Sequence, residues 1–203
     1  ERPLLTLGLP DRDKQETMQL MPAAQFACGS ILHPSVIVAH SYGGIVVQQM
    51  IPLCPEKIKQ IIYVTAMTSL PGEDPFASFS KAEQNYYSGG VKFDKTLMTP
   101  LSREQFMAMM AGTGYKFDPV WPSIHSELAD SGQKGVKYTL SSWLEIPKAY
   151  VIATQDQVIL PGTQQVFLKK GRIETVREIR SGHLPMVTKP KELAMILADL
   201  SLL

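Results

Sequence analysis

Three side chains have the types and spacing suited to nucleophilic catalysis: Ser41, Asp156 and His183. A serine hydroxyl is a weak nucleophile until a neighbouring base takes its proton, and a histidine base needs a carboxylate to orient it. Asp156 stands two residues after an apolar stretch at 148–154, and His183 four residues after a stretch at 173–179 that alternates with period two. Both stretches are predicted strands. Because the carboxyl ends of parallel strands share one edge of a sheet, we expect the three side chains to meet there.

The segment around Ser41 predicts a sharp turn between a buried strand and a helix. Four β-prone apolar residues lead into Ala39-His40-Ser41-Tyr42-Gly43-Gly44, and a new apolar run follows. This is the strand–turn–helix context of the nucleophile elbow G-x-S-x-G, with Ala39 in the first glycine position. Small residues are needed there because neighbouring elements crowd the serine. The turn leaves the backbone N–H of Tyr42 at the helix N-terminus, where it is predicted to stabilise an oxyanion.

The other histidines are weaker candidates for the base. The side chain of His40 is expected to point away from that of Ser41, His33 precedes its strand, and His125 lies in a segment without a core strand. The order Ser, acid, His along the chain is the one expected for this elbow. The alternatives are an ordinary serine in a glycine turn, a turn-forming Asp156 and a loop histidine at His183.

The pattern of apolar segments predicts one α/β domain over 1–203 with a mostly parallel, doubly wound sheet. Further predicted elements are a strand over 3–10, a weak helix over 16–27 interrupted by Pro22, a helix over 44–51, a strand over 58–66, a helix over 161–170 and a last helix from about 190. Strand, helix, strand at this spacing is typical of a parallel βαβ unit. The core is predicted to comprise 1–69 and 143–203.

Residues from about 70 to 142 break this rhythm and predict a helical cap inserted between core strands. Ser102 and Gln105 form a capping box for one helix of this segment, and Leu101 and Phe106 a hydrophobic staple. Methionine and aromatic residues are frequent here. They are expected to roof an apolar pocket, the alternative being a helical lobe that packs its own small core.

The composition describes a folded protein without a strong electrostatic field. Of the 203 residues, 44% are hydrophobic and 19% charged, and the formal net charge is +1. With no cluster of basic and aromatic residues, we expect no nucleic-acid partner, and the apolar runs are too short to span a membrane. Cys28 and Cys54 stand outside any C-x-x-C or His/Cys cluster. We therefore expect two buried free thiols, a reducing, cytoplasmic location and no metal or organic cofactor. The pattern carries no information on oligomeric state.

With these residues in place, the chain resembles the α/β-hydrolase superfamily, and more closely the plant-type methylesterase and hydroxynitrile lyase family with its bacterial esterase relatives. The stretches that carry the resemblance are 39–44, 63–67 with Leu70-Pro71-Gly72-Glu73, 150–161 and 181–186. The resemblance implies that Ser41 is the nucleophile, Asp156 the acid and His183 the base.

Two departures from the family pattern have consequences. Family members begin with a strand that ends in a His-Gly-type loop, which supplies the second oxyanion N–H. No such loop precedes the elbow here, so we expect the N-terminal strands of the fold to be missing, with either a leading segment absent or a half-built oxyanion hole. The lyases of the family carry a lysine directly after the catalytic histidine. That position is Leu184, which favours an esterase over a lyase.

The sequence therefore predicts a serine esterase that cleaves small, largely apolar carboxylic esters through an acyl-enzyme on Ser41. Met67, at the carboxyl end of a predicted strand, and Leu184 are expected to line the substrate pocket. Two alternatives remain: carbon–carbon hydrolysis or lyase chemistry on the same triad, and a non-catalytic or receptor-like protein of this fold.

Overall fold

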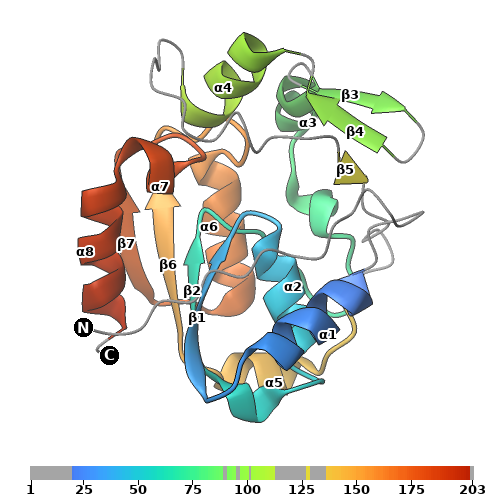
Figure 1. Ribbon diagram of the computed structural model, residues 1–203, viewed down its shortest axis with the longest axis vertical. Helices are drawn as coiled ribbons and strands as arrows, with labels where there is room; N and C mark the ends of the chain where they lie inside the picture. The colour runs from blue at the N-terminus through green and yellow to red at the C-terminus, as the bar shows by residue number, and fades with distance from the viewer. Residues whose placement is uncertain are drawn as a thin grey trace.

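Four apolar segments form a parallel sheet in the computed structural model, which describes residues 20–88, 91–94, 97–100, 102–112, 127–128 and 136–201. The order across the sheet is β1-β2-β6-β7, and each neighbouring pair is parallel. The strands are β1 Ser35–His40, β2 Ile58–Val64, β6 Lys148–Ala153 and β7 Thr175–Ile179. Their carboxyl ends lie at one edge of the sheet (Figure 1). The predicted parallel α/β sheet is confirmed.

Four helices lie where the sequence predicts them: α1 Leu20–Ser30, α2 Gly43–Met50, α6 Pro161–Gly171 and α8 Pro190–Leu200. The short helices α5 Leu140–Glu145 and α7 Pro185–Thr188 and the 3₁₀ turn η2 Pro55–Lys57 were not predicted. Both faces of the sheet are covered. In β2, Ile61 and Tyr63 pack in one cluster with α1, α2 and α6, whereas Ile62 and Val64 pack in a second cluster with α8. This alternation explains why residues 61–64 of β2 form a continuous apolar run: a strand segment buried on both faces has no polar side.

The segment between β2 and β6 contains more than the predicted helices. Its elements are η3 Pro75–Ser78, α3 Lys81–Ser88, β3 Val91–Asp94, β4 Leu97–Pro100, α4 Arg103–Ala111 and β5 Glu127–Leu128, and the three strands form an antiparallel sheet that the sequence analysis did not expect. Of these, α3, α4, β3 and β4 lie beyond the carboxyl ends of the parallel strands, whereas α5 lies at the opposite end (Figure 1). Ser102 is confirmed as the N-cap of α4, since Ser102 Oγ accepts a hydrogen bond from Gln105 N at 3.1 Å, and it donates to Gln105 Oε1 at 2.9 Å. Leu101 of the staple and the strand predicted over 3–10 lie outside the described residues, and the cap boundaries stay a prediction.

Two expectations for the N-terminal half were wrong. The helix predicted to break at Pro22 is continuous, because Pro22 is the third residue of α1, in the first turn, where its missing N–H removes no helical hydrogen bond. Cys28 and Cys54 are not free thiols. They form a disulfide between α1 and the segment after α2, with Cα atoms 6.0 Å apart. Two cysteines 26 residues apart in sequence do not indicate that they pair. The prediction of a cytoplasmic location was based on free thiols, so the disulfide removes its support.

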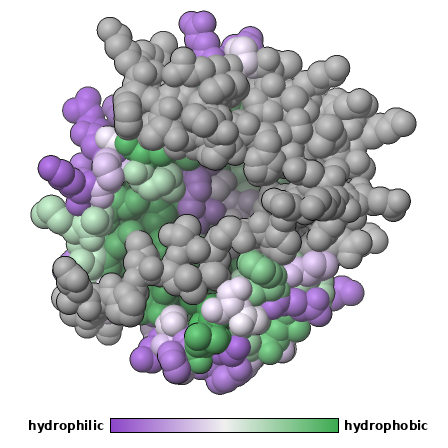
Figure 2. Space-filling view, in the orientation of Figure 1, coloured by the Kyte–Doolittle hydropathy of each residue, from purple (hydrophilic) through white to green (hydrophobic). Residues whose placement is uncertain are grey.

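The exposed surface of the sheet region is partly apolar. Figure 2 shows hydrophobic residues on the visible face over the region that the parallel strands occupy in Figure 1. Val38 of β1, the strand at one edge of the four described here, is 43% exposed. In the part of the chain that the structure describes, no helix has the length and apolar character needed to cross a bilayer.

Candidate active site

Ser41 lies at the apex of the turn between β1 and α2. Its φ is +52°, in the left-handed region that residues other than glycine seldom adopt. Its carbonyl oxygen accepts hydrogen bonds from Gly44 N at 3.2 Å and from Met67 N at 2.9 Å. A Cβ on Gly44 would overlap the carbonyl oxygen of Met67, so only glycine fits at this position. The turn therefore has the crowded, strained form expected of a nucleophile elbow, and it presents a partly exposed Ser41 at the carboxyl end of β1.

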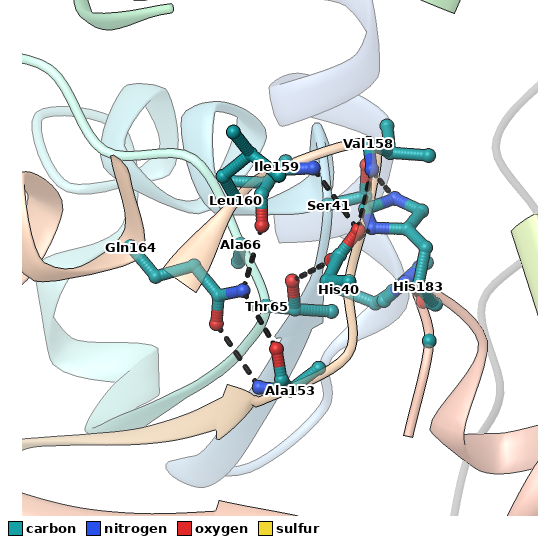
Figure 3. Close-up of polar contacts among 12 residues, drawn as sticks. His40, Ser41, Thr65, Ala66, Ala153, Val158, Ile159, Leu160, Gln164 and His183 are labelled. Atoms are coloured by element: carbon teal, nitrogen blue, oxygen red, sulfur yellow. Dashed lines mark hydrogen bonds and ion pairs between the residues drawn. The ribbon is translucent and has the colours of Figure 1, made fainter. Parts of the chain in front are cut away.

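The structure brings His183 and Asp156 to Ser41. His183 Nε2 lies 2.9 Å from Ser41 Oγ, and His183 Nδ1 lies 2.7 Å from Asp156 Oδ2. Both distances are within hydrogen-bonding range. Asp156 follows β6 and His183 follows β7, so the shared edge of the sheet produces the arrangement (Figure 3). His183 is 1% exposed and Asp156 is fully buried, which leaves Ser41 as the accessible end of the line.

The carboxyl group of Asp156 is held ionised by its surroundings. Asp156 Oδ1 accepts hydrogen bonds from Val158 N at 2.7 Å and Ile159 N at 3.0 Å, in addition to the His183 contact on Oδ2. Burial alone would raise the pKa of Asp156, but the charge of His183 and the hydrogen bonds from His183, Thr65 and Ile159 N hold that pKa below its ordinary value. A carboxylate of this kind fixes the tautomer of the histidine and stabilises the imidazolium.

Thr65 is a further residue of the candidate site, one that the sequence pattern did not indicate. Its hydroxyl donates to Asp156 Oδ2, the same oxygen that binds His183, and its side chain is fully buried. The φ of Thr65 is +37°, an unusual conformation for a β-branched residue. Its position directly after β2 could have pointed to the site edge, but a single threonine at a strand end is too common a feature to be informative.

His40 also contacts the site, by a route that the sequence did not indicate. As the last residue of β1 it donates from Nε2 to the carbonyl oxygen of His183 at 2.7 Å, and the two rings have centroids 4.8 Å apart. Burial, and then the charge of His183, lower the pKa of His40 to about 3. His40 is therefore neutral at physiological pH and adds no positive charge beside the base.

Gln164 of α6 is the third contributor absent from the sequence analysis. Its amide is fully buried and bridges the end of β6 to the turn after it. Gln164 Oε1 accepts from Ala153 N at 3.0 Å, and Nε2 donates to the carbonyl oxygens of Ala153 and Ile159 at 3.1 and 2.7 Å (Figure 3). The amide thus ties the last residue of β6 to the turn that carries Asp156.

The remaining predicted residues adjoin this arrangement. Tyr42 is the N-cap residue of α2 and directly follows Ser41. Met67 and Leu184 are both buried, at 3% and 8% exposure, and the N–H of Leu184 donates to Met110 O of α4 at 3.2 Å. Their roles in an oxyanion hole or pocket stay predictions. Within the described ranges no three His, Cys, Asp or Glu side chains are grouped so as to hold a metal ion. His125 lies outside these ranges.

Comparisons with known proteins agree with this architecture. Residues 5–196 match the family model described as "Alpha/beta hydrolase family". The chain is 24% identical over 185 residues to Methylesterase 7 of Arabidopsis thaliana, a match that covers 82% of this chain and 68% of the relative. It is 26% identical over 180 residues to Pyrethroid hydrolase of Sphingobium wenxiniae, covering 81% and 62%. A crystal structure of a pyrethroid hydrolase from Sphingobium faniae superimposes with a TM-score of 0.76 at 19% identity, covering 92% of this chain and 79% of that one.

Proposed function

Because the chain belongs to the alpha/beta hydrolase family, we propose that it is a serine hydrolase that cleaves small, largely apolar carboxylic esters through an acyl-enzyme on Ser41. The enzyme class expected from the sequence, a carboxylic ester hydrolase, is confirmed by the relatives named methylesterase and pyrethroid hydrolase. The observation that carries the finer proposal is the continuous line of contacts from Ser41 Oγ through His183 to Asp156.

The first half of the reaction forms the acyl-enzyme. His183 Nε2 takes the proton of Ser41 as its Oγ attacks the ester carbonyl carbon, and the carbonyl electron pair moves onto oxygen. The backbone N–H of Tyr42, at the N-terminus of α2, donates to this oxyanion. When the tetrahedral intermediate collapses, the C–O bond to the alcohol breaks and the imidazolium returns its proton to the leaving oxygen. The carboxylate of Asp156 stabilises the imidazolium throughout.

The second half hydrolyses the acyl-enzyme. A water molecule takes the place of the departed alcohol, His183 removes its proton, and the hydroxide attacks the acyl carbon. Collapse of the second tetrahedral intermediate breaks the bond to Ser41 Oγ, which recovers its proton from His183. Two apolar residues adjoin the triad along the backbone: Met67, whose N–H donates to Ser41 O, and Leu184, which directly follows His183. Their apolar character supports a preference for small apolar acyl or alcohol groups.

The proposal is tested by turnover of p-nitrophenyl esters of increasing acyl length. We expect hydrolysis that is faster for acetate and butyrate than for long acyl chains. Ser41→Ala should lower kcat by about 10⁴-fold or more. Ser35→Ala is the matched control, because Ser35 begins the strand that ends before Ser41 and its hydroxyl bonds only locally, to His33 O at 2.7 Å.

Two results would overturn the ester-hydrolase proposal. Full activity in Ser41→Ala would exclude Ser41 as the nucleophile. A folded wild-type protein that hydrolyses none of the esters, yet cleaves carbon–carbon bonds or is only stabilised by ligands, would favour the lyase or receptor alternatives. The residue after His183 is the buried, apolar Leu184, which argues against a cyanohydrin lyase.

A further inference from the structure

Glu83 is a buried carboxylate outside the triad, on the first helix of the segment above the sheet. It belongs to α3 and is 1% exposed. A carboxylate removed from water is costly unless it accepts hydrogen bonds from several donors. The donors to Glu83 come from two separate parts of the chain, the start of α3 and the N-terminus of α6.

The local partners of Glu83 form a capping box at the start of α3. Glu83 Oε2 accepts from Ser80 N at 2.8 Å, and Ser80 Oγ accepts from Glu83 N at 3.2 Å. This reciprocal pair satisfies two N–H groups that a helix N-terminus leaves without partners. A capping box accounts for a surface glutamate, but it does not by itself account for a fully buried one.

The distant partners of Glu83 lie at the N-terminus of α6. Glu83 Oε1 accepts from Leu160 N at 2.9 Å, and Oε2 accepts from Thr163 Oγ1 at 2.9 Å. Leu160 is the N-cap residue of α6 and supplies no side-chain cap of its own. Since negative charge is favoured at a helix N-terminus, Glu83 caps α6 from another part of the chain while it caps its own helix.

The turn that leads into α6 also carries Asp156. The N–H groups of Val158 and Ile159 bind Asp156 Oδ1, and the next N–H along the chain, that of Leu160, binds Glu83 Oε1. Three successive backbone donors are thus divided between two buried carboxylates. If Glu83 is removed, the far end of the turn loses its acceptor and the two donors that orient Asp156 are less well fixed.

We propose that Glu83 is a positioning residue, which fixes the turn of Asp156 and the start of α6 to α3. It acts on the reaction only through the orientation of Asp156, so the proposal rests on the proposed function for its catalytic consequence. Contact between α3 and the turn that carries Asp156 is then required to align Asp156 with His183 and Ser41.

The test compares Glu83→Ala with two control variants. Each control removes a polar contact near α3 and α6 but keeps the hydrogen bond from Leu160 N to Glu83. Glu73→Ala removes a carboxylate that accepts from Leu70 N and pairs with Lys170 of α6. Thr163→Val removes a donor to Glu83 but leaves the Leu160 contact in place. We expect kcat for p-nitrophenyl acetate to fall about 10- to 100-fold in Glu83→Ala with KM within about threefold, because a lost hydrogen bond to a charged group has an effect of this size. The two controls should keep kcat within about threefold of wild type.

Hydrogen exchange gives a second readout that does not depend on esterase activity. In Glu83→Ala the amides of Val158 and Ile159 should exchange at least tenfold faster relative to the amides of β6, and in the controls they should not. If the wild type hydrolyses no ester, the proposed function fails, and the exchange data alone decide whether Glu83 holds the turn. If Glu83→Ala does not fold, Glu83→Gln, which keeps one acceptor oxygen, is measured in the same way. Unchanged kcat and unchanged exchange at both amides would overturn the proposal, as would an equal loss of kcat in Thr163→Val.

Discussion

The turn that carries Ser41 and the turn that carries Asp156 are held in place by different means. The turn that carries Ser41 is fixed by backbone contacts, because Ser41 O accepts hydrogen bonds from two N–H groups. It also needs a glycine, because Gly44 leaves room for the Met67 carbonyl. Side-chain polar atoms fix the second, since Asp156 accepts from two amides and from Thr65, and Gln164 ties the turn to β6. Activity should therefore fall when a side chain gains volume in the turn that carries Ser41. In the turn that carries Asp156, activity should fall when a polar atom is removed and the shape of the side chain is kept.

Gly44 and the adjacent Gly43 give the sharpest test of the volume argument. A Cβ on Gly44 would overlap backbone, whereas a Cβ on Gly43 would meet no atom within 4 Å. We expect Gly44→Ala to lose about 3 kcal/mol or more of unfolding free energy, because the overlapped carbonyl cannot move aside, and to lose nearly all ester turnover. Gly43→Ala should fold and turn over ester like the wild type. Urea unfolding and ester kinetics measure both, and equal behaviour of the two variants would contradict the account.

Thr65 provides the corresponding test of the polar argument. Thr65→Val keeps the branched shape and removes the hydroxyl that donates to Asp156, whereas Thr65→Ser keeps the hydroxyl. A buried acceptor that loses its donor costs about 1–3 kcal/mol, so we expect kcat in Thr65→Val to fall by about 10- to 100-fold. Thr65→Ser should retain most of the activity. A valine variant that is as active as the serine variant would show that the hydroxyl does not act on Asp156.

His40 should make the stability of the fold, more than the rate of turnover, depend on pH. The pKa of His40 is lowered from 6.5 to about 3 by burial and by the charge of His183. Below about pH 6.5 the unfolded chain binds a proton that the native protein does not, so this group destabilises the fold progressively as the pH falls towards 3. Glutamine cannot bind that proton. We expect His40→Gln to lose less unfolding free energy than the wild type between pH 7 and pH 4.5; parallel losses would contradict the shift.

The Cys28–Cys54 disulfide lies away from both turns and should have the smallest effect on turnover. It joins α1 to the segment after α2 and closes a loop of 26 residues in sequence separation. We expect the double variant Cys28→Ala/Cys54→Ala to lose about 2–4 kcal/mol of unfolding free energy, chiefly because the unfolded chain is no longer constrained. Its kcat at 25 °C should match that of the wild type. A large fall in kcat in the folded variant would show that α1 supports the site.

The sequence predicted the parts of the site that depend on local pattern and strand order. Ser41 was identifiable because a buried strand, small residues and a helix surround it, and Asp156 and His183 because each follows a strand that ends at the same edge. Because the strands are parallel, residues that follow different strands end up at the same sheet edge, so the meeting of these three side chains could be predicted without any knowledge of packing.

The supporting residues could not be predicted because their contacts join segments that are far apart in the chain. Thr65 meets Asp156 across 91 residues, His40 meets His183 across 143, and Glu83 meets Leu160 across 77. No local pattern marks such pairs. The antiparallel strands β3 to β5 were missed for a similar reason: they are four residues long or shorter, and the pairing with β5 spans a long connection.

Covalent labelling of the nucleophile tests the central claim most directly. The wild-type protein is treated with a fluorophosphonate, its intact mass is recorded, and the labelled peptide is mapped. A single adduct on Ser41, absent from His183→Ala, is the result that the contacts from Ser41 through His183 to Asp156 predict. A folded wild-type protein that gains no adduct, or gains it on another serine, would contradict the assignment of Ser41 as an activated nucleophile.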